Sequence, residues 1–205
     1  MVAYFLFSLA GFFSGSIMFS FLLAKWVFKV DIIEQGPDHN PGMTNVMRCV
    51  GTAPGLLCLV LDVAKAALPV YIARRVLGMD ALPFAFVIAA PVLGHAFSPM
   101  LKGKGGKAIA ASCGVFLAVS GAREPVVLYF LGAMALFSLV IVVKPDSLRM
   151  IISVFVFALL CFVLPAPRSA PLGALLVAAT VIFKHLTNYD NEKARVHFLP
   201  AKKKP

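Results

Sequence analysis

Charged residues are scarce in this chain: they make up 14% of its 205 residues, and only nine of them are acidic. Hydrophobic residues make up 60%, and the mean hydropathy is +0.92. A soluble domain of this length carries more polar surface, so the composition excludes an ordinary soluble protein and indicates a polytopic membrane protein. The net charge of +10 would favour nucleic acid as the partner of a soluble protein. Here the basic residues stand at the ends of apolar runs, which favours membrane lipids or an anionic substrate and no nucleic acid.

Cysteine is also rare, and its distribution excludes two kinds of site. The four cysteines are scattered through apolar segments, without the paired spacing of a zinc site or of a disulfide framework. We therefore predict no metal site and no cofactor. The first apolar run is too long, and too poor in preceding basic residues, for a cleaved signal peptide, so we interpret it as a membrane span.

Long apolar runs fill most of the chain, and a membrane helix needs roughly 20 such residues. The candidate spans are 2–28, 52–76, 81–100, 107–120, 126–143, 148–164 and 170–183. The sequence thus predicts an all-α fold, a polytopic membrane bundle of about seven transmembrane helices that forms a single domain over residues 1–205. A polar, basic tail follows the last span, and we expect 189–205 to lie in the cytoplasm.

The basic residues are distributed unequally between the two ends of this bundle. Fourteen of the nineteen lie in or beside the tail and the loops after spans one, three and five; four lie on the other side, and Lys65 lies within a span. Cytoplasmic loops are enriched in lysine and arginine. We therefore expect the C-terminus inside the cell, the N-terminus outside, and a multi-pass location in the cell's inner (cytoplasmic) membrane. Every segment rich in hydrogen-bonding side chains then faces the cytoplasm.

A short basic, glycine-rich hinge, 101–107, lies between the third and fourth spans and contains Lys104-Gly105-Gly106-Lys107. Glycines let backbone N–H groups approach a ligand closely, successive N–H groups form a concave anion site, and lysine adds full positive charge. The following helix would direct the positive end of its dipole to the same place. The hinge predicts a phosphate-binding site at the membrane surface; a plain topology signal in a flexible loop is the alternative.

The loop between the first two spans is dense in turn formers and in hydrogen-bonding side chains. Its arginine, Arg48, has a planar guanidinium that can bind phosphate in a bidentate manner, so it is the best single phosphate-binding candidate there. The other candidate ligands are Gly36, Asn40, Gly42, Thr44 and Asn45. The alternative is an ordinary solvated loop with an arginine near the lipid headgroups.

Charged and histidine side chains also occur within or beside the later spans. Asp62 and Lys65 are three residues apart inside the second span, so they share a helix face. A structural ion pair is the favoured interpretation, since intramembrane charges normally point into the bundle. His95 ends the third span, and we favour a packing role over a role as a base. His185 and Asn188 share one face after the last span, where they could bind phosphate or hydroxyl groups or form an interfacial cap.

Taken together, these motifs resemble the bacterial acyl-phosphate:glycerol-3-phosphate acyltransferase family, known as PlsY. The resemblance covers nearly the whole chain and depends on several motifs in the same order. They are Gly15-Ser16; Gly36 with Asn40-Pro41-Gly42-Met43-Thr44-Asn45 and Arg48; Leu61-Asp62 with Lys65; Gly94-His95; Lys104-Gly105-Gly106-Lys107; and His185 with Asn188.

The resemblance implies transfer of a fatty acyl group from acyl-phosphate to the 1-hydroxyl of glycerol-3-phosphate, which gives lysophosphatidate and phosphate. It implies acyl-phosphate, glycerol-3-phosphate and membrane lipids as partners, together with an enzyme that supplies the acyl-phosphate. Catalytic roles are implied for Lys107, Arg48, His185 and Asn188. Substrate binding is expected at Lys104, Gly105, Gly106, Gly36, Asn40, Gly42, Thr44 and Asn45, whereas Asp62, Lys65 and His95 are expected to be structural or orienting.

Three departures from the family pattern fall at this site. Residues 37–39 replace the family's Ser-Gly, and an acidic Asp38 is unfavourable near phosphate unless it points away. Ala108 stands at a hinge position that is glycine in the family, and 186–187 replace Arg-Glu in the last motif. Two other functions therefore stay open: a transporter or channel for an anion, which would need a continuous polar path, and a catalytically silent lipid-binding homologue.

Overall fold

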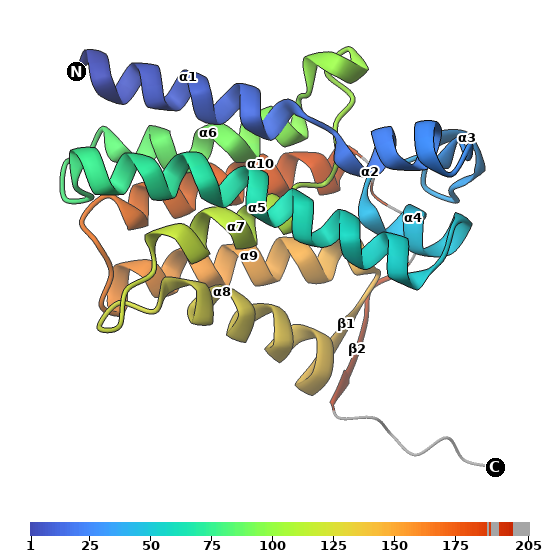
Figure 1. Cartoon of the computed structure of the whole chain (residues 1–205). Coiled ribbons are helices and arrows are strands. Elements are labelled where there is room, and N and C mark those ends of the chain that lie inside the picture. Colours follow the sequence, from blue (N-terminus) through green and yellow to red (C-terminus); the bar gives the residue numbers. More distant parts are fainter. Residues whose placement is uncertain (188, 190–192, 199–205) are drawn as a thin grey trace.

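The chain runs back and forth along one axis in the computed structural model, so that helices distant in sequence lie side by side (Figure 1). The structure describes residues 1–187, 189 and 193–198. The α-helices are α1 (Val2–Ser16), α2 (Phe19–Leu22), α3 (Ile32–Gln35), α4 (Met43–Cys49), α5 (Thr52–Leu77), α6 (Phe84–Ala96), α7 (Ile109–Val119), α8 (Val126–Ala135), α9 (Asp146–Val163) and α10 (Ala170–Thr187). Short π- or 3₁₀-helical turns follow at η1 (Leu23–Val27), η2 (Pro99–Leu101) and η3 (Leu136–Val140), and the strands are β1 (Ile141–Lys144) and β2 (Arg195–Phe198).

The mostly helical membrane fold predicted from the sequence is confirmed. Within the described residues, five helical segments are long and apolar enough to cross a membrane: Val2–Val27, Thr52–Leu77, Phe84–Leu101, Asp146–Val163 and Ala170–Thr187. The fourth and fifth predicted spans correspond to shorter apolar helices, Ile109–Val119 and Val126–Val140. The 11 residues of α7 extend only about 16 Å, against a hydrocarbon core of about 30 Å. The count of seven crossings and the orientation of the termini stay predictions.

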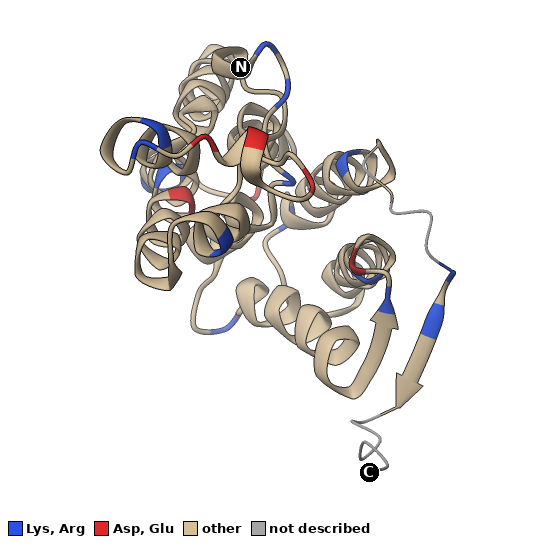
Figure 2. Cartoon of the chain, turned by 90° about the vertical axis from the view of Figure 1, so that its right-hand side faces the viewer, with Lys and Arg blue, Asp and Glu red and all other residues tan. Residues whose placement is uncertain are grey.

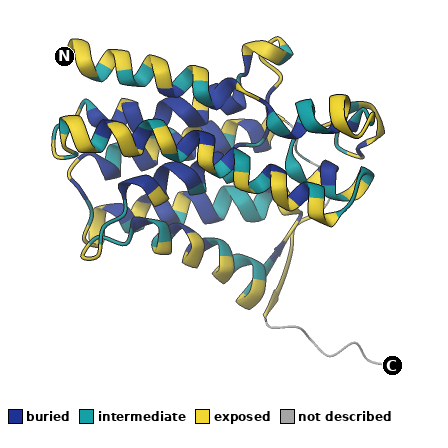
Figure 3. Cartoon of the chain, viewed as in Figure 1, coloured by how far each residue is buried: buried dark blue, intermediate teal, exposed yellow. Residues whose placement is uncertain are grey.

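Helix α6 lies at the centre of the bundle and is buried along most of its length. It packs against α1 and α10, and α7 packs against α5. Figure 3 shows the buried residues in this interior, while the outward faces are exposed. Those faces are apolar, with Phe86 58% exposed and Leu117 53% exposed, as expected for helices that contact lipid. Close packing of α1 on α6 depends on Gly15, because a Cβ there would lie 2.0 Å from the carbonyl oxygen of Pro91.

The first predicted span, 2–28, is not one continuous helix. It breaks at Ile17 and Met18, whose backbone leaves the helical conformation, and resumes as α2 and η1. A break exposes carbonyl groups that the apolar membrane interior cannot hydrate. Two side chains satisfy them: Ser98 Oγ donates to the carbonyl of Ser16 at 2.6 Å, and Lys65 Nζ donates to the carbonyl of Ile17.

A small antiparallel sheet is the feature that the helical prediction missed. Strands β1 and β2 pair with Lys144 opposite Arg195 and Ile141 opposite Phe198. The fifth predicted span, 126–143, therefore ends as a helix at Val140 and continues as a strand. The reason is local: three consecutive β-branched residues favour extended backbone, and the proline that follows Lys144 disfavours the helical region there.

The segments that contain the candidate ligands meet at one end of the bundle. The loop between η1 and α5, the hinge before α7, the turn into α9 and the end of α10 lie at the right in Figure 1. Figure 2 looks onto that end and shows lysine and arginine distributed around it. This arrangement gathers the candidate ligands from widely separated parts of the chain.

Candidate functional site

The hinge folds back onto the end of α6. Lys102 and Gly103 have positive φ angles of 52° and 81°, which turn the chain after η2. The backbone N–H of Gly106 then donates to the carbonyl of His95 at 3.1 Å. A Cβ on Gly105 would lie 2.0 Å from that same carbonyl oxygen. The glycines are therefore required by close backbone approach, and this contact fixes the position of Lys107.

Lys107 points toward the first loop, where it meets Asp38. Its Nζ lies 3.0 Å from Asp38 Oδ2. The other carboxylate oxygen, Asp38 Oδ1, accepts from Asn45 Nδ2 at 2.8 Å and from the backbone N–H of Asn40 at 3.4 Å. Burial raises the pKa of Asp38, but the Lys107 ammonium and the Asn45 amide outweigh it, so the pKa lies below the ordinary value of 3.8. Asp38 is thus a carboxylate at neutral pH.

The local fold of the first loop holds Asn45 in place. Asp31 caps α3 by accepting from the backbone N–H groups of Ile33 and Glu34. Asn45 is 1% exposed, and a Cβ on Gly36 would lie 2.2 Å from its Nδ2 atom. Nδ2 also donates to the carbonyl of Asn40 at 2.9 Å. Both N–H groups of this amide therefore have partners.

Two predicted ligands of this loop do not join the cluster directly. Thr44 is exposed, and its hydroxyl reaches only the neighbouring Met43 Sδ at 3.9 Å. Arg48 is exposed and makes no hydrogen bond or ion pair with another described residue. It stands one helical turn beyond Asn45 on α4, so its guanidinium can reach the same end of the bundle. Gly42 precedes α4 as its N-cap residue.

His185 reaches the site from α10. It is 4% exposed, and neither ring nitrogen has a hydrogen-bond partner among the described residues. It lies close enough to Lys107 and Asp38 to interact electrostatically with both. An unpaired buried imidazole is unfavourable, so we expect His185 to have a partner outside the described residues. Asn188, predicted on the same face, lies outside the described residues.

The intramembrane charges form a separate cluster. Lys65 Nζ lies 2.8 Å from Asp62 Oδ1, both side chains are 2% exposed, and Ser20 Oγ donates to Asp62 Oδ2 at 3.0 Å. His95 Nδ1 is 4.0 Å from Asp62 Oδ1. Because Lys65 also donates to the carbonyl of Ile17, the cluster stabilises the non-helical backbone at the break in the first span. A structural role for the pair stays a prediction.

The structure thus brings together Lys107, Asn45, Asn40 and His185, and it leaves Lys104, Thr44 and Arg48 exposed at the rim. Sequence reasoning missed how Asp38 is used: it points into the cluster instead of away. The signal was present, since an acidic residue in a loop that faces a lysine-rich hinge has a cation to pair with.

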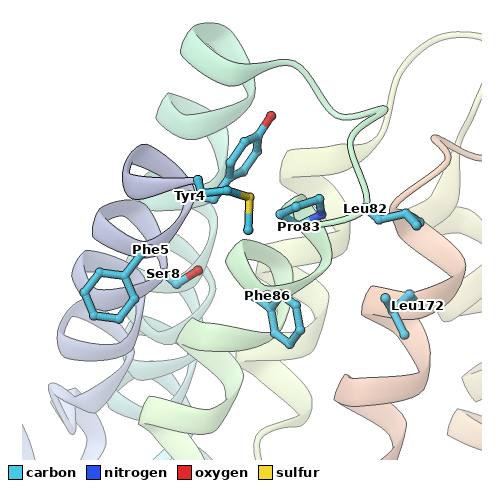
Figure 4. Close-up of a pocket in the computed structure, with 8 residues that line it drawn as sticks. Tyr4, Phe5, Ser8, Leu82, Pro83, Phe86 and Leu172 are labelled. Carbon is cyan, nitrogen blue, oxygen red and sulfur yellow. The ribbon is translucent and has the colours of Figure 1, made fainter.

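An apolar pocket of about 470 Å³ lies at the opposite end of the bundle, between α1, α6 and the start of α10 (Figure 4). Its lining residues are Met1, Tyr4, Phe5, Ser8, Leu82, Pro83, Phe86 and Leu172. None of its side chains is charged, whereas the cluster around Lys107 supplies an ammonium and an amide to an anionic group, so that cluster is the candidate site for an anion.

Comparison with known proteins places the chain in a family. The sequence model of the family described as Glycerol-3-phosphate acyltransferase matches residues 5–194. A glycerol-3-phosphate acyltransferase 2 from Thermotoga maritima is 34% identical over 187 residues, covering 91% of each chain. One from Trichlorobacter lovleyi is 38% identical over 175 residues, covering 85% of this chain and 86% of that one.

Solved structures are also similar. The crystal structure of PlsY, an integral membrane glycerol 3-phosphate acyltransferase, in its glycerol 3-phosphate form has a TM-score of 0.77 and 32% sequence identity, covering 90% of this chain and 89% of that one. Its lysophosphatidic acid form has a TM-score of 0.74 and 31% identity over the same shares. The chain described here belongs to the glycerol-3-phosphate acyltransferase family of integral membrane proteins.

Proposed function

We propose that this protein is an acyltransferase of the cytoplasmic membrane that moves a fatty acyl group from acyl-phosphate to the 1-hydroxyl of glycerol-3-phosphate. The products are lysophosphatidate and inorganic phosphate. Family membership and the names of the relatives support glycerol-3-phosphate as the acceptor. One observation carries the proposal. Donors from two segments distant in sequence converge on a single anionic group, the Asp38 carboxylate, at the polar end of the bundle. These donors are Lys107, Asn45 and the backbone of Asn40.

The chemistry suits these groups. An acyl-phosphate is already activated, so the hydroxyl of the acceptor can attack its carbonyl carbon while the carbon–oxygen bond to phosphate breaks. A covalent enzyme intermediate is unnecessary. Two phosphates must lie close together, and the charges of Lys107 and Arg48 would offset their repulsion and stabilise the negative charge that develops in the transition state.

The proton of the attacking hydroxyl needs an acceptor. The buried ring nitrogens of His185 have no partner among the described residues, so the imidazole is available to take that proton or to donate to a phosphate oxygen. The departing phosphate is a second acceptor. Both routes balance, because the proton lost by the hydroxyl ends on His185 or on inorganic phosphate.

The membrane supplies the acyl substrate. Acyl-phosphate carries a long apolar chain, and the exposed faces of the bundle are apolar up to the polar end. The chain can remain among lipid tails while its phosphate meets Lys107. Glycerol-3-phosphate arrives from the aqueous side, which we propose to be the cytoplasm because most basic residues gather there.

The test is an assay of the purified protein with acyl-phosphate and glycerol-3-phosphate. We expect lysophosphatidate, and we expect Lys107→Ala and Arg48→Ala each to lower kcat/KM by about tenfold or more. Lys102→Ala is the matched control, because Lys102 is an exposed lysine of the same hinge and should leave activity unchanged. A parallel assay with an acyl thioester tests the donor. No product from folded protein would rule out the enzyme, and undiminished variants would rule out this site.

A further inference from the structure

Asp38 is an anion in a site built to bind anions. Its two carboxylate oxygens are held by separate donors, Lys107 on one side and Asn45 with the backbone of Asn40 on the other. These are the groups that the proposed function assigns to substrate phosphate. The site is therefore already occupied by a side chain of the protein itself.

We propose that Asp38 is a built-in competitor of the substrate phosphate: its carboxylate occupies Lys107 and Asn45 in the empty site and must leave them before glycerol-3-phosphate binds productively. This inference depends on the proposed function, since it concerns the same site. It assigns to Asp38 control over substrate affinity and no part in bond breaking.

The hydrogen-bond inventory supports exchange instead of simultaneous binding. The side-chain amide of Asn45 has two N–H groups, and they serve Asp38 and the carbonyl of Asn40. No N–H of Asn45 remains for phosphate until one of these bonds is released. Both bonds lie within the first loop. The acceptor in the bond to Asp38 is an anionic oxygen, which an incoming phosphate oxygen can replace in kind, whereas the acceptor in the bond to Asn40 is a backbone carbonyl.

Electrostatics favours the same conclusion. A phosphate and a carboxylate that contact one ammonium group would lie within a few ångströms of each other and repel strongly. Two further cations of the polar end, Lys104 and Arg48, are exposed to solvent, so water screens the charge that they could offer against this repulsion. Moving the Asp38 carboxylate away removes the repulsion and frees Lys107.

Asp38 is placed where it can move. It lies between α3 and α4, outside both helices, and its side chain is 32% exposed, against 20% for that of Lys107. Rotation of its side chain can bring the carboxylate to water without changing a helix. Until then the carboxylate keeps the Lys107 side chain directed at the site, so the competitor lowers substrate affinity but keeps the binding groups in position.

The experiment compares glycerol-3-phosphate binding by wild type, Asp38→Asn and Asp38→Ser, using calorimetry in detergent at neutral pH, together with KM and kcat. Asp38→Asn keeps the shape of the side chain and an oxygen for Asn45, so folding is expected to survive. Removing a competitor of a partly exposed ion pair should tighten binding by about threefold to tenfold. KM should fall by a similar factor with little change in kcat. Glu34→Gln removes the same charge from an exposed position of the same loop and should resemble wild type.

The outcomes separate this inference from the proposed function. Equal or weaker binding by the Asp38 variants would overturn it, as would equal tightening in Glu34→Gln, which would mean a general charge effect. If neither wild type nor any variant forms lysophosphatidate, the proposed function fails, and binding of inorganic phosphate still tests the competition.

A difference infrared spectrum of wild type with ¹³C-labelled aspartate is independent of folding of the variants. Substrate must shift one carboxylate band, and an unchanged spectrum at saturation would overturn the inference.

Discussion

Replacing Lys65 by methionine should destabilise the bundle severely. Methionine has a similar length and no charge. The change removes the ammonium that lies 2.8 Å from Asp62 Oδ1 and that binds the carbonyl of Ile17. Asp62 would then keep the hydrogen bond from Ser20 and a longer contact with His95, 4.0 Å from Nδ1 to Oδ1, in a position where its side chain is 2% exposed.

The magnitude follows from the burial. Breaking a buried ion pair by removing one partner leaves an uncompensated charge, and this typically lowers the free energy of unfolding by about 3–5 kcal/mol. For a chain of this size, each kcal/mol corresponds to about 2–4 °C, so the apparent melting temperature should fall by about 6–20 °C. The double variant Lys65→Met with Asp62→Asn removes both charges. It should recover about 2 kcal/mol relative to the sum of the single changes.

Thermal unfolding in detergent, followed through the single tryptophan Trp26, measures these differences. Lys104→Met is the matched control: the same substitution at an exposed lysine should shift the melting temperature by less than about 2 °C. The reasoning is refuted if Lys65→Met melts within that range of wild type. It is also refuted if the double variant loses the full sum of the two single losses, because the charges would then be uncoupled.

Three further predictions concern the polar end. Ala108 is held at a φ of 65°, where glycine is favoured, so Ala108→Gly should stabilise the protein by about 0.5–1 kcal/mol in the same unfolding assay. Gly105→Ala would set a Cβ 2.0 Å from a backbone carbonyl of α6, whereas Gly132→Ala meets nothing within 4 Å. Only the former should reduce lysophosphatidate formation, by about tenfold or more. Because the pKa of Asp38 is lowered in the folded state, its contribution to stability is present above the ordinary value of 3.8 and is lost as pH falls below it. The stability difference between wild type and Lys107→Met should therefore shrink below about pH 4 in melting curves recorded across pH.

The membrane spans were the part of the fold that was easiest to predict from the sequence, because the length of an apolar run alone indicates a membrane helix. The break at Ile17 and Met18 was not visible in this way. It depends on Lys65 and Ser98, which lie 48 and 82 residues from the carbonyls they satisfy. A window that averages hydropathy over neighbouring residues cannot detect partners at such separations. The strand β1 was hidden for another reason: its β-branched residues are as apolar as the helix that precedes them.

The candidate site was also only partly predictable from the sequence. Motif spacing identified Lys107 and Asn45, which the structure joins through Asp38. It also named Thr44 and Arg48, whose exposure depends on which face of α4 turns inward. That orientation is set by packing of α4 on α5, not by residue type. The direction of Asp38 depended on pairing across 69 residues, which a local motif does not describe.

The separation of the polar end from the apolar bundle has a consequence for how such a protein can diverge. Insertion into the bilayer depends on the hydrophobic helices, whereas most residues of the proposed binding site lie in polar loops between those helices. Asp38 lies in one of those loops, so under our proposal a substitution at this position would alter the affinity of the binding site without changing the hydrophobic helices that insert into the membrane. A single loop substitution would then adjust the response of the protein to substrate concentration while the helices that carry the loop stay unchanged.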